Sequence, residues 1–177
     1  MKALSTCMLA ILIGLTAGAA WAAKGAAGPT DPQIAEIVVT ANQVDIDAGK
    51  LAKDRSKTKD VQAFAERMVT DHSGVNKAAT DLVTKLKVTP EASETSLSLQ
   101  KGGDENLDKL KNLEGHAFDK AYIDHEVTYH EAVLKAIDKT LIPNAKNAEL
   151  KALLVKVRPA FVDHLAHAKS LQAELAK

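Results

Sequence analysis

The chain has 177 residues, of which 46% are hydrophobic and only 3% aromatic. This length predicts one domain, and few aromatic residues among abundant Ala and Leu favour closely packed helices over a β-sandwich. The 23 basic and 23 acidic residues balance, so charge gives no reason to expect nucleic acid or a strongly charged partner.

The first 22 residues, MKALSTCMLAILIGLTAGAAWA, have the features of an export signal. A basic residue precedes an apolar run, and Ala20-Trp21-Ala22 fits the A-x-A cleavage rule, so we expect cleavage near Ala22. The run is short for a membrane span, and we expect no transmembrane segment in the mature chain. We therefore predict a periplasmic or secreted protein, with a signal peptide at 1–22, a flexible leader at 23–30 and a helical domain at 31–177.

Four segments after the leader have apolar residues at every third or fourth position, which is typical of amphipathic helices. The first is expected over 31–53, with Thr30 or Asp31 as its N-cap and Pro32 in its first turn, where proline is tolerated. A short turn then makes it an antiparallel neighbour of the second helix, which is expected to end near Lys87.

The segment that follows interrupts this pattern with Pro90 and the pair Gly102-Gly103. It is expected to be a long linker with short helices near 93–100 and 106–113, and it could cross the length of the bundle. The third helix is expected over 116–140 and the fourth from 148 to the end, kinked or restarted at Pro159. The predicted fold is an all-α four-helix bundle with a long crossover linker between helices two and three.

Three of these helices each carry one histidine within an otherwise unbroken apolar stripe. The stripe of the second helix steps through Val61, Ala65, Met68, His72, Val75, Ala79 and Leu82. The third runs through Ile123, Val127, His130, Leu134, Ile137 and Leu141, and the fourth through Leu150, Leu154, Val157, Phe161, His164, Ala168, Leu171 and Leu175. The other three histidines lie outside these stripes.

The first helix has an aspartate, Asp45, in the corresponding position, and Glu126 lies one turn before His130. Buried polar groups are costly unless they find partners. The imidazoles of His72, His130 and His164 could bind a divalent transition metal (zinc, copper or iron), completed by Glu126 or Asp45. They could instead form a hydrogen-bonded cluster with these carboxylates and a trapped water. Counting from a turn at 142–147 places His164 about 10 Å deeper than His130.

Two functions remain open on these residues. The first is an exported, metal-binding helical-bundle protein of the periplasm. The second is a non-catalytic structural or interaction protein, associated with the envelope or with envelope stress. The sequence favours no enzyme, because it has no Gly-rich phosphate loop, no H-E-x-x-H and no G-x-S-x-G motif. Its one cysteine, Cys7, lies in the predicted signal. We therefore assign no catalytic or cofactor-binding residue.

Three runs together resemble one family of secreted bacterial proteins: DIDAGKLAKDRSKTKDVQAFAERMVTDH, GHAFDKAYIDHEVTYH and RPAFVDHLAHAKSL. This is the family of domain of unknown function 4142, whose members are often labelled outer membrane proteins. The resemblance implies a ferritin-like bundle in the periplasm or envelope, without an established activity. It places the family's motif histidines at His72, His130 and His164 and its helix-one acid at Asp45. Because Glu126 precedes His130 by four residues and no E-x-x-H motif occurs, iron storage and ferroxidase chemistry are not expected.

Overall fold

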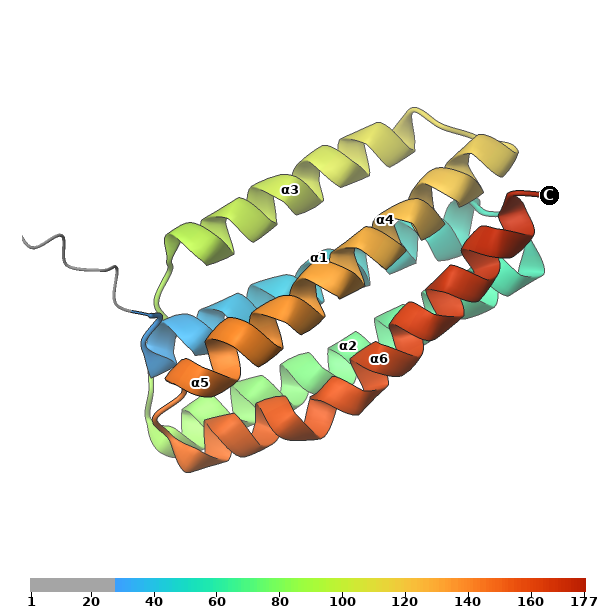
Figure 1. The fold of residues 1–177 in the computed structure, drawn as a ribbon. Helices are drawn as coiled ribbons and strands as arrows, with labels where there is room; N and C mark the ends of the chain where they lie inside the picture. Colours follow the sequence, from blue (N-terminus) through green and yellow to red (C-terminus); the bar gives the residue numbers. More distant parts are fainter. Residues whose placement is uncertain (1–27) are drawn as a thin grey trace, which may run out of the picture.

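The computed structural model describes residues 28–177, and all regular structure in this part of the chain is helical (Figure 1). The predicted signal peptide and most of the leader therefore lie outside the described residues. Four long helices form a bundle: α1 (Asp31–Arg55), α2 (Lys59–Leu86), α4 (Gly115–Ala136) and α6 (Ala148–Leu175). The predicted all-α four-helix bundle with a long crossover is confirmed.

The crossover between α2 and α4 is itself one helix, α3 (Glu94–Lys111). The predicted break at Gly102-Gly103 is wrong. Gly103 is buried against α1, where a Cβ atom would lie 2.7 Å from Cγ2 of Val44. This close packing compensates for the low helix propensity of glycine. Because α3 runs the length of the bundle along α1, α2 and α4 run parallel to each other (Figure 1).

The start of α1 is fixed by its cap and by a tie to α6. The hydroxyl of Thr30 accepts from the backbone N–H of Gln33, whose side chain accepts from the N–H of Thr30, and this capping box confirms one of the two predicted caps. The carboxylate of Asp31 accepts from the backbone N–H groups of Lys146 and Asn147, at 2.8 and 2.9 Å. These contacts hold the two helix starts together at one end of the bundle.

The helix of α4 runs past its predicted end at 140, whereas α6 begins and ends close to its predicted bounds. The helix of α4 continues through a π-helical turn, η1 (Ile137–Leu141), and a short α5 (Ile142–Asn144). Arg158 of α6 donates two hydrogen bonds to Asp138 of η1, at 2.6 and 2.7 Å. Pro159 lies inside α6 without ending it. The carbonyl that this proline leaves unpaired belongs to Val155, a residue that is 54% exposed.

Two apolar clusters fill the bundle, one toward each end. The first, called the packed half, is formed by Ala48, Ala52, Val61, Phe64, Ala65, Met68, Leu110, Phe118, Tyr122, Ile123, Val127, Ala168 and Leu171. The second, called the hollow half because a cavity adjoins it, is formed by Ile34, Ile37, Val38, Ala79, Ile137, Leu141, Ala145, Leu150, Leu154 and Phe161. A layer of polar side chains separates the two clusters.

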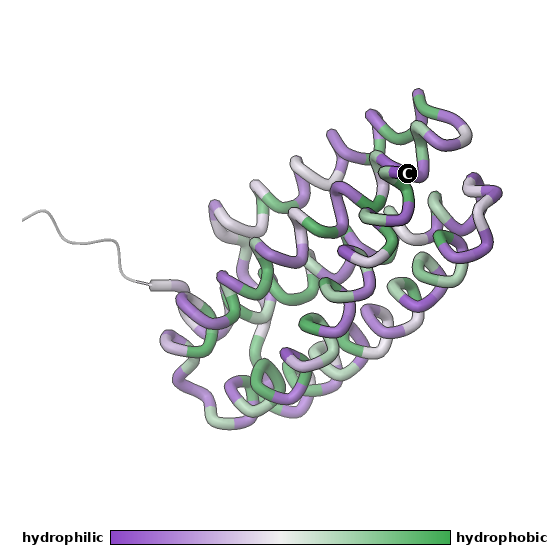
Figure 2. The backbone as a smooth tube through the Cα atoms, turned by 45° about the vertical axis from the view of Figure 1, so that its right-hand side comes forward, coloured by the Kyte–Doolittle hydropathy of each residue, from purple (hydrophilic) through white to green (hydrophobic). Residues whose placement is uncertain are grey.

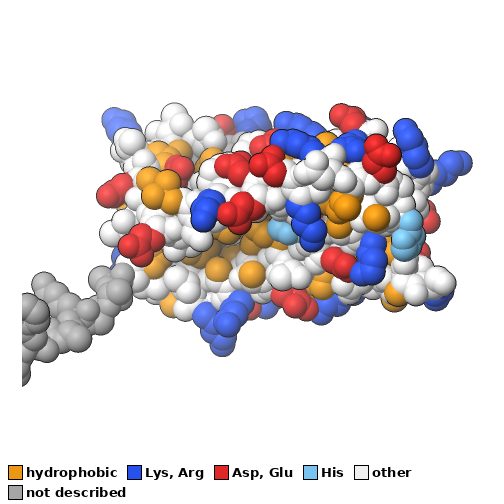
Figure 3. All heavy atoms as spheres, turned by 90° about the horizontal axis from the view of Figure 1, so that it is seen from above, with side chains coloured by type: hydrophobic (Ala, Val, Ile, Leu, Met, Phe, Trp, Pro, Cys, Tyr) orange, Lys and Arg blue, Asp and Glu red, His pale blue; other side chains and the backbone are white. Residues whose placement is uncertain are grey.

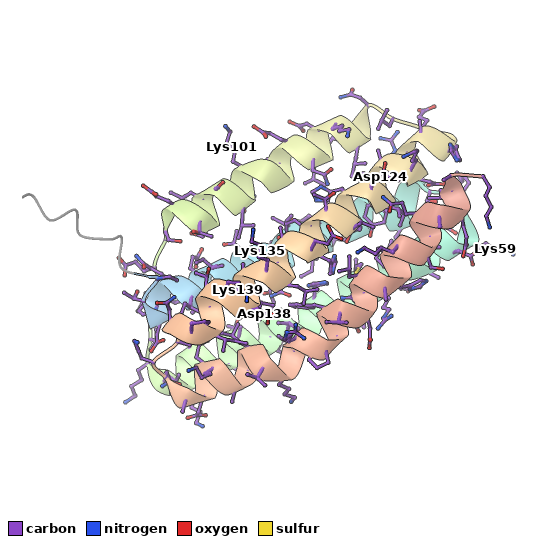
Figure 4. All side chains as sticks on the ribbon, viewed as in Figure 1. Lys59, Lys101, Asp124, Lys135, Asp138 and Lys139 are labelled. Carbon is purple, nitrogen blue, oxygen red and sulfur yellow. The ribbon has the colours of Figure 1, made fainter. Side chains whose placement is uncertain are left out.

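The outer faces of the helices are hydrophilic. Figure 2 shows hydrophobic and hydrophilic stretches alternating along the helices, as expected where one face is buried. Lys101 of α3, labelled in Figure 4, points away from the bundle, and its side chain is 79% exposed. Among the described residues, no helix combines the length and the apolar character needed to cross a membrane.

Candidate metal centre

Three histidines from three helices meet in the polar layer at the middle of the bundle. His72 of α2, His130 of α4 and His164 of α6 are each at most 1% exposed. Their ring centroids are 5.6 Å apart for His72 and His130, 5.2 Å for His72 and His164, and 5.5 Å for His130 and His164. One potential ligand atom from each residue lies within 4.8 Å of those of the other two. We call these residues the histidine triad.

The helix connections explain why the three rings share one level. His72 and His130 lie at similar depths because the crossover helix α3 makes α2 and α4 parallel (Figure 1). The expected 10 Å offset of His164 is not found. Since the helix of α4 extends through η1 and α5, His130 lies 14 residues before Asn144, and His164 lies 16 residues after Ala148. The two histidines are therefore nearly level on adjacent antiparallel helices.

Each imidazole of the triad uses one ring nitrogen in a hydrogen bond to a neighbouring oxygen. Nδ1 of His72 lies 2.7 Å from Oδ1 of Asn42, whose amide nitrogen donates to the carbonyl of Val38 at 2.7 Å. The amide orientation is thereby fixed, and Nδ1 of His72 must be the donor. Because a neutral imidazole carries one proton, Nε2 of His72 keeps its lone pair.

The other two rings follow the same logic. Nδ1 of His130 donates to the backbone carbonyl of Glu126 at 3.0 Å, and Nε2 of His164 donates to the carboxylate of Asp71 at 2.8 Å. Hydrogen bonds of this kind set the tautomer and the ring orientation of histidines that bind metals. They leave Nε2 of His130 and Nδ1 of His164 as lone-pair nitrogens.

These three remaining nitrogens have no hydrogen-bond partner among the described residues. All are acceptors, and acceptors cannot satisfy one another. Burial lowers the pKa of all three rings, that of His130 to about 4, which keeps the imidazoles neutral near pH 7. Three neutral imidazoles that each place a ring nitrogen within 4.8 Å of those of the other two can act together as ligands of zinc, copper or iron.

Both predicted carboxylates lie in the same layer. Oδ2 of Asp45 is 3.5 Å from Nε2 of His72, and Oε2 of Glu126 is 3.4 Å from Nδ1 of His130. Ligand atoms of Asp45, Glu126 and His130 form a second group within 4.8 Å of one another. Burial raises the pKa of Asp45 to about 7, and burial beside Asp45 raises the pKa of Glu126 well above its usual range. This carboxyl pair therefore favours a shared proton or a nearby cation. The structure brings all five predicted residues together.

Two residues that orient the triad were not predicted. Asn42 precedes Asp45 by three residues on the same face of α1, and this spacing was the available signal. Asp71 adjoins His72 in the sequence, but successive helical residues point about 100° apart, so its carboxylate reaches His164 on α6. It is held there by Arg67 as well, at 3.3 Å.

The site lies in a stretch of chain that comparison assigns to a family. The family described as domain of unknown function 4142 (DUF4142) matches residues 16–171. The chain belongs to this family. The DUF4142 match spans every residue of the triad and both carboxylates. It confirms the resemblance that the three sequence runs indicated.

A solved structure supports the fold of this DUF4142 chain. It is the crystal structure of a DUF305 protein from Streptomyces coelicolor, inferred to be secreted. The two chains are 13% identical and superpose with a TM-score of 0.67, over 81% of this chain and 92% of the other. At this identity the likeness concerns the fold alone. No curated protein matches the chain.

Proposed function

We propose that this protein binds one divalent transition-metal ion through the histidine triad, and that it does so outside the cytoplasm after export. The observation that carries the proposal is the convergence of three buried ring nitrogens without partners. The opposite nitrogen of each ring is occupied by an oxygen acceptor, which is the arrangement that prepares histidines as ligands.

Three imidazoles make a soft-to-intermediate ligand set that suits zinc, copper or iron. Glu126 or Asp45 would complete a four-coordinate site, since tetrahedral zinc sites commonly combine nitrogen with carboxylate oxygen. Iron storage is not part of the proposal. Di-iron bundles use an E-x-x-H motif on two helices, whereas Glu126 and His130 are four residues apart on one helix. Binding of an ion would also link α2, α4 and α6 through one centre.

A second candidate is a purely structural cluster, and the raised pKa of Asp45 is the observation in its favour. A protonated Asp45 could donate to Nε2 of His72, from which its Oδ2 lies 3.5 Å. This would satisfy one lone pair and leave those of His130 and His164 without a donor. A bound metal ion is therefore the better explanation, because it would serve all three buried ring nitrogens that lack a hydrogen-bond donor.

The decisive experiment is metal analysis of protein produced without a histidine tag. We expect about one zinc, copper or iron ion per chain, or uptake of one equivalent of zinc on titration after treatment with a chelator. The variant His130→Gln should lose this uptake, and so should the triple substitution of the triad by alanine. His116→Gln is the matched control, because His116 is exposed and bonds only to the carbonyl of Leu175.

Thermal unfolding separates the two candidates even if a variant folds poorly. An ion that binds only the folded state adds about 3 kcal/mol at a free concentration 100 times its Kd. A chelator should therefore lower the Tm of the wild type and leave that of His130→Gln unchanged. A wild-type chain that neither holds nor takes up an ion, with a Tm indifferent to zinc and chelator, would establish the structural cluster instead.

The export step is tested separately. We propose that residues 1–22 are a signal peptide and that residues 31–177 form the helical domain. Protein recovered from the periplasm or medium should begin near Ala23, as read by N-terminal sequencing or mass. A chain retained in the cytoplasm with Met1 intact would contradict the proposed location. It would leave the proposal of a metal site unaffected.

A further inference from the structure

A cavity of about 310 Å³ lies in the hollow half, between α1, α4 and α6. It exists because α1 packs mainly on α2 and α3, so its contact with α4 is slight. The N-terminal part of α3 borders the space on its outer side through Thr95 and Leu99. Its walls are mainly aliphatic, with Phe161, Tyr129 and Thr140 among them, and the aliphatic side chains are those of Ile37, Val38, Ala41, Val75, Val133, Ala136, Ile137, Leu141, Leu154 and Val157.

The size of this cavity suits a small organic molecule. An apolar cavity of about 150 Å³ binds benzene, which has six non-hydrogen atoms. The cavity of this protein is about twice as large, which corresponds to roughly ten to twelve non-hydrogen atoms on the same scale. Its mainly apolar lining offers few hydrogen-bond partners to a sugar, a nucleotide or a peptide. The body of the ligand must therefore be apolar.

The inner end of the cavity is polar and presents two buried atoms without hydrogen-bond partners, one from Asp45 and one from His72. Asp45 and His72 reach it from the polar layer, and both are at most 3% exposed. Oδ1 of Asp45 and Nε2 of His72 have no hydrogen-bond partner within residues 28–177. Asn42 also lines this end, but its amide already donates to Val38 and accepts from His72. A ligand that enters must therefore bring a donor, and a positive charge would complement the carboxylate of Asp45.

A groove of about 490 Å³ on the surface leads to the cavity. It runs between α3 and α4, and Thr95, Leu99 and Tyr129 line both the groove and the cavity. Figure 3 looks onto this side of the molecule and shows hydrophobic side chains inside a hollow with charged side chains around it. Glu94 stands at the groove and adds an acidic group along the path.

We propose that this cavity binds a linear primary amine of about nine to eleven carbon atoms, with its ammonium group on Asp45 and its chain among the aliphatic side chains. The proposal goes beyond metal binding and does not require it. The triad nitrogens of His130 and His164 do not line the cavity. With an ion bound to the triad and Glu126, Asp45 remains available to the ammonium group.

The test is a calorimetric titration of the mature, untagged protein with decylamine, decan-1-ol and decanoate. These probes share one chain and differ in the head group. We expect one decylamine to bind per protein, at least about tenfold more tightly than decanol or decanoate. Asp45→Asn should remove this preference. Ala136→Phe should abolish binding by filling the cavity, whereas Ala117→Phe, at an exposed site on the same helix, should leave binding unchanged.

Three outcomes would overturn the proposal: no binding of decylamine below its micellar concentration, decanoate binding as tightly as decylamine, or full binding to a folded Ala136→Phe variant. Ala41→Leu provides a milder filling variant should Ala136→Phe unfold, and it should weaken decylamine binding by at least about tenfold. Repeating the titration after chelator treatment keeps the two proposals apart. Decylamine binding by a protein that neither holds nor takes up a metal ion would support the amine site and contradict the metal site.

Discussion

The two ends of this bundle use the same kinds of side chain to different effect. In the packed half, residues such as Phe64, Leu110 and Ile123 are completely buried and adjoin no cavity described for the chain. In the hollow half, the aliphatic side chains surround a cavity of about 310 Å³, and a π-helical turn lies beside it. The polar layer lies between the two halves. We infer that the packed half supplies stability, whereas the hollow half accepts looser packing so that a ligand can enter.

The largest expected effect is a difference between two matched truncations. Leu110→Ala in the packed half should lower the free energy of unfolding by about 4 kcal/mol, because the void left there has no room to relax. Leu154→Ala in the hollow half should cost only about 2 kcal/mol, because this side chain already borders a cavity and makes fewer contacts on that side. Urea unfolding of the metal-free protein measures both.

Leu97→Ala is the control for this pair, because Leu97 is 64% exposed and its loss should change stability by less than about 0.5 kcal/mol. Equal losses for Leu110→Ala and Leu154→Ala would remove the distinction between the two halves.

A smaller loss of stability is expected when the pH is lowered, and it depends on His125, which lines the groove outside the cavity. Burial, together with nearby Lys109, lowers the pKa of His125 to about 4, whereas the unfolded chain titrates near 6.5. Between these values the unfolded state binds more protons, so stability contributed by neutral His125 is present above pH 6.5 and is lost as the pH falls toward 4. Between pH 7 and 4.5 the wild type should lose roughly 2 kcal/mol more than His125→Gln.

The free energy of unfolding, measured with urea at several pH values, checks this difference. The other titrating groups, including the pair Asp45 and Glu126, are present in both proteins, so their contributions to the pH dependence largely cancel in the comparison. Parallel pH profiles for the wild type and His125→Gln would show that the groove leaves His125 solvated.

Effects of opposite sign are expected at the adjacent glycines Gly102 and Gly103, where the sequence predicts a break in the helix. Gly103→Ala should destabilise the protein by about 1–3 kcal/mol, because the new Cβ would lie 2.7 Å from a methyl group of Val44. Gly102→Ala should stabilise it by roughly 0.5–1 kcal/mol, since nothing lies within 4 Å and alanine is the better helix former. Thermal unfolding of both variants measures this pair. Effects of the same sign would mean that α3 does not pack on α1 as described.

Periodicity was sufficient to locate the four long helices and to single out the triad. The stripes of α2, α4 and α6 each place one histidine on the buried face, and burial of His72, His130 and His164 follows directly from that spacing. The length of the crossover segment allowed α2 and α4 to run parallel, and the helix α3 does cross the bundle in this way. These inferences succeed because the apolar face of a helix is buried in the folded protein regardless of which other helices pack against it.

The remaining features depend on contacts between distant segments. The two glycines of α3 favour a break locally, but tertiary packing against Val44 reverses this preference. The extension of α4 through the π-helical turn and α5 has no sequence signal of its own, and this extension brings His164 level with His130. Asn42 and Asp71 contribute only through oxygens that meet rings from other helices. The cavity likewise arises from the spacing of α1 and α4, which no single helix encodes.

The most direct test of the metal centre is anomalous diffraction from crystals grown with one equivalent of zinc, recorded on both sides of the zinc absorption edge. We predict a single strong peak about 2.0–2.1 Å from Nε2 of His72, Nε2 of His130 and Nδ1 of His164. A strongest peak on surface carboxylates, or no peak among the three rings, would contradict it.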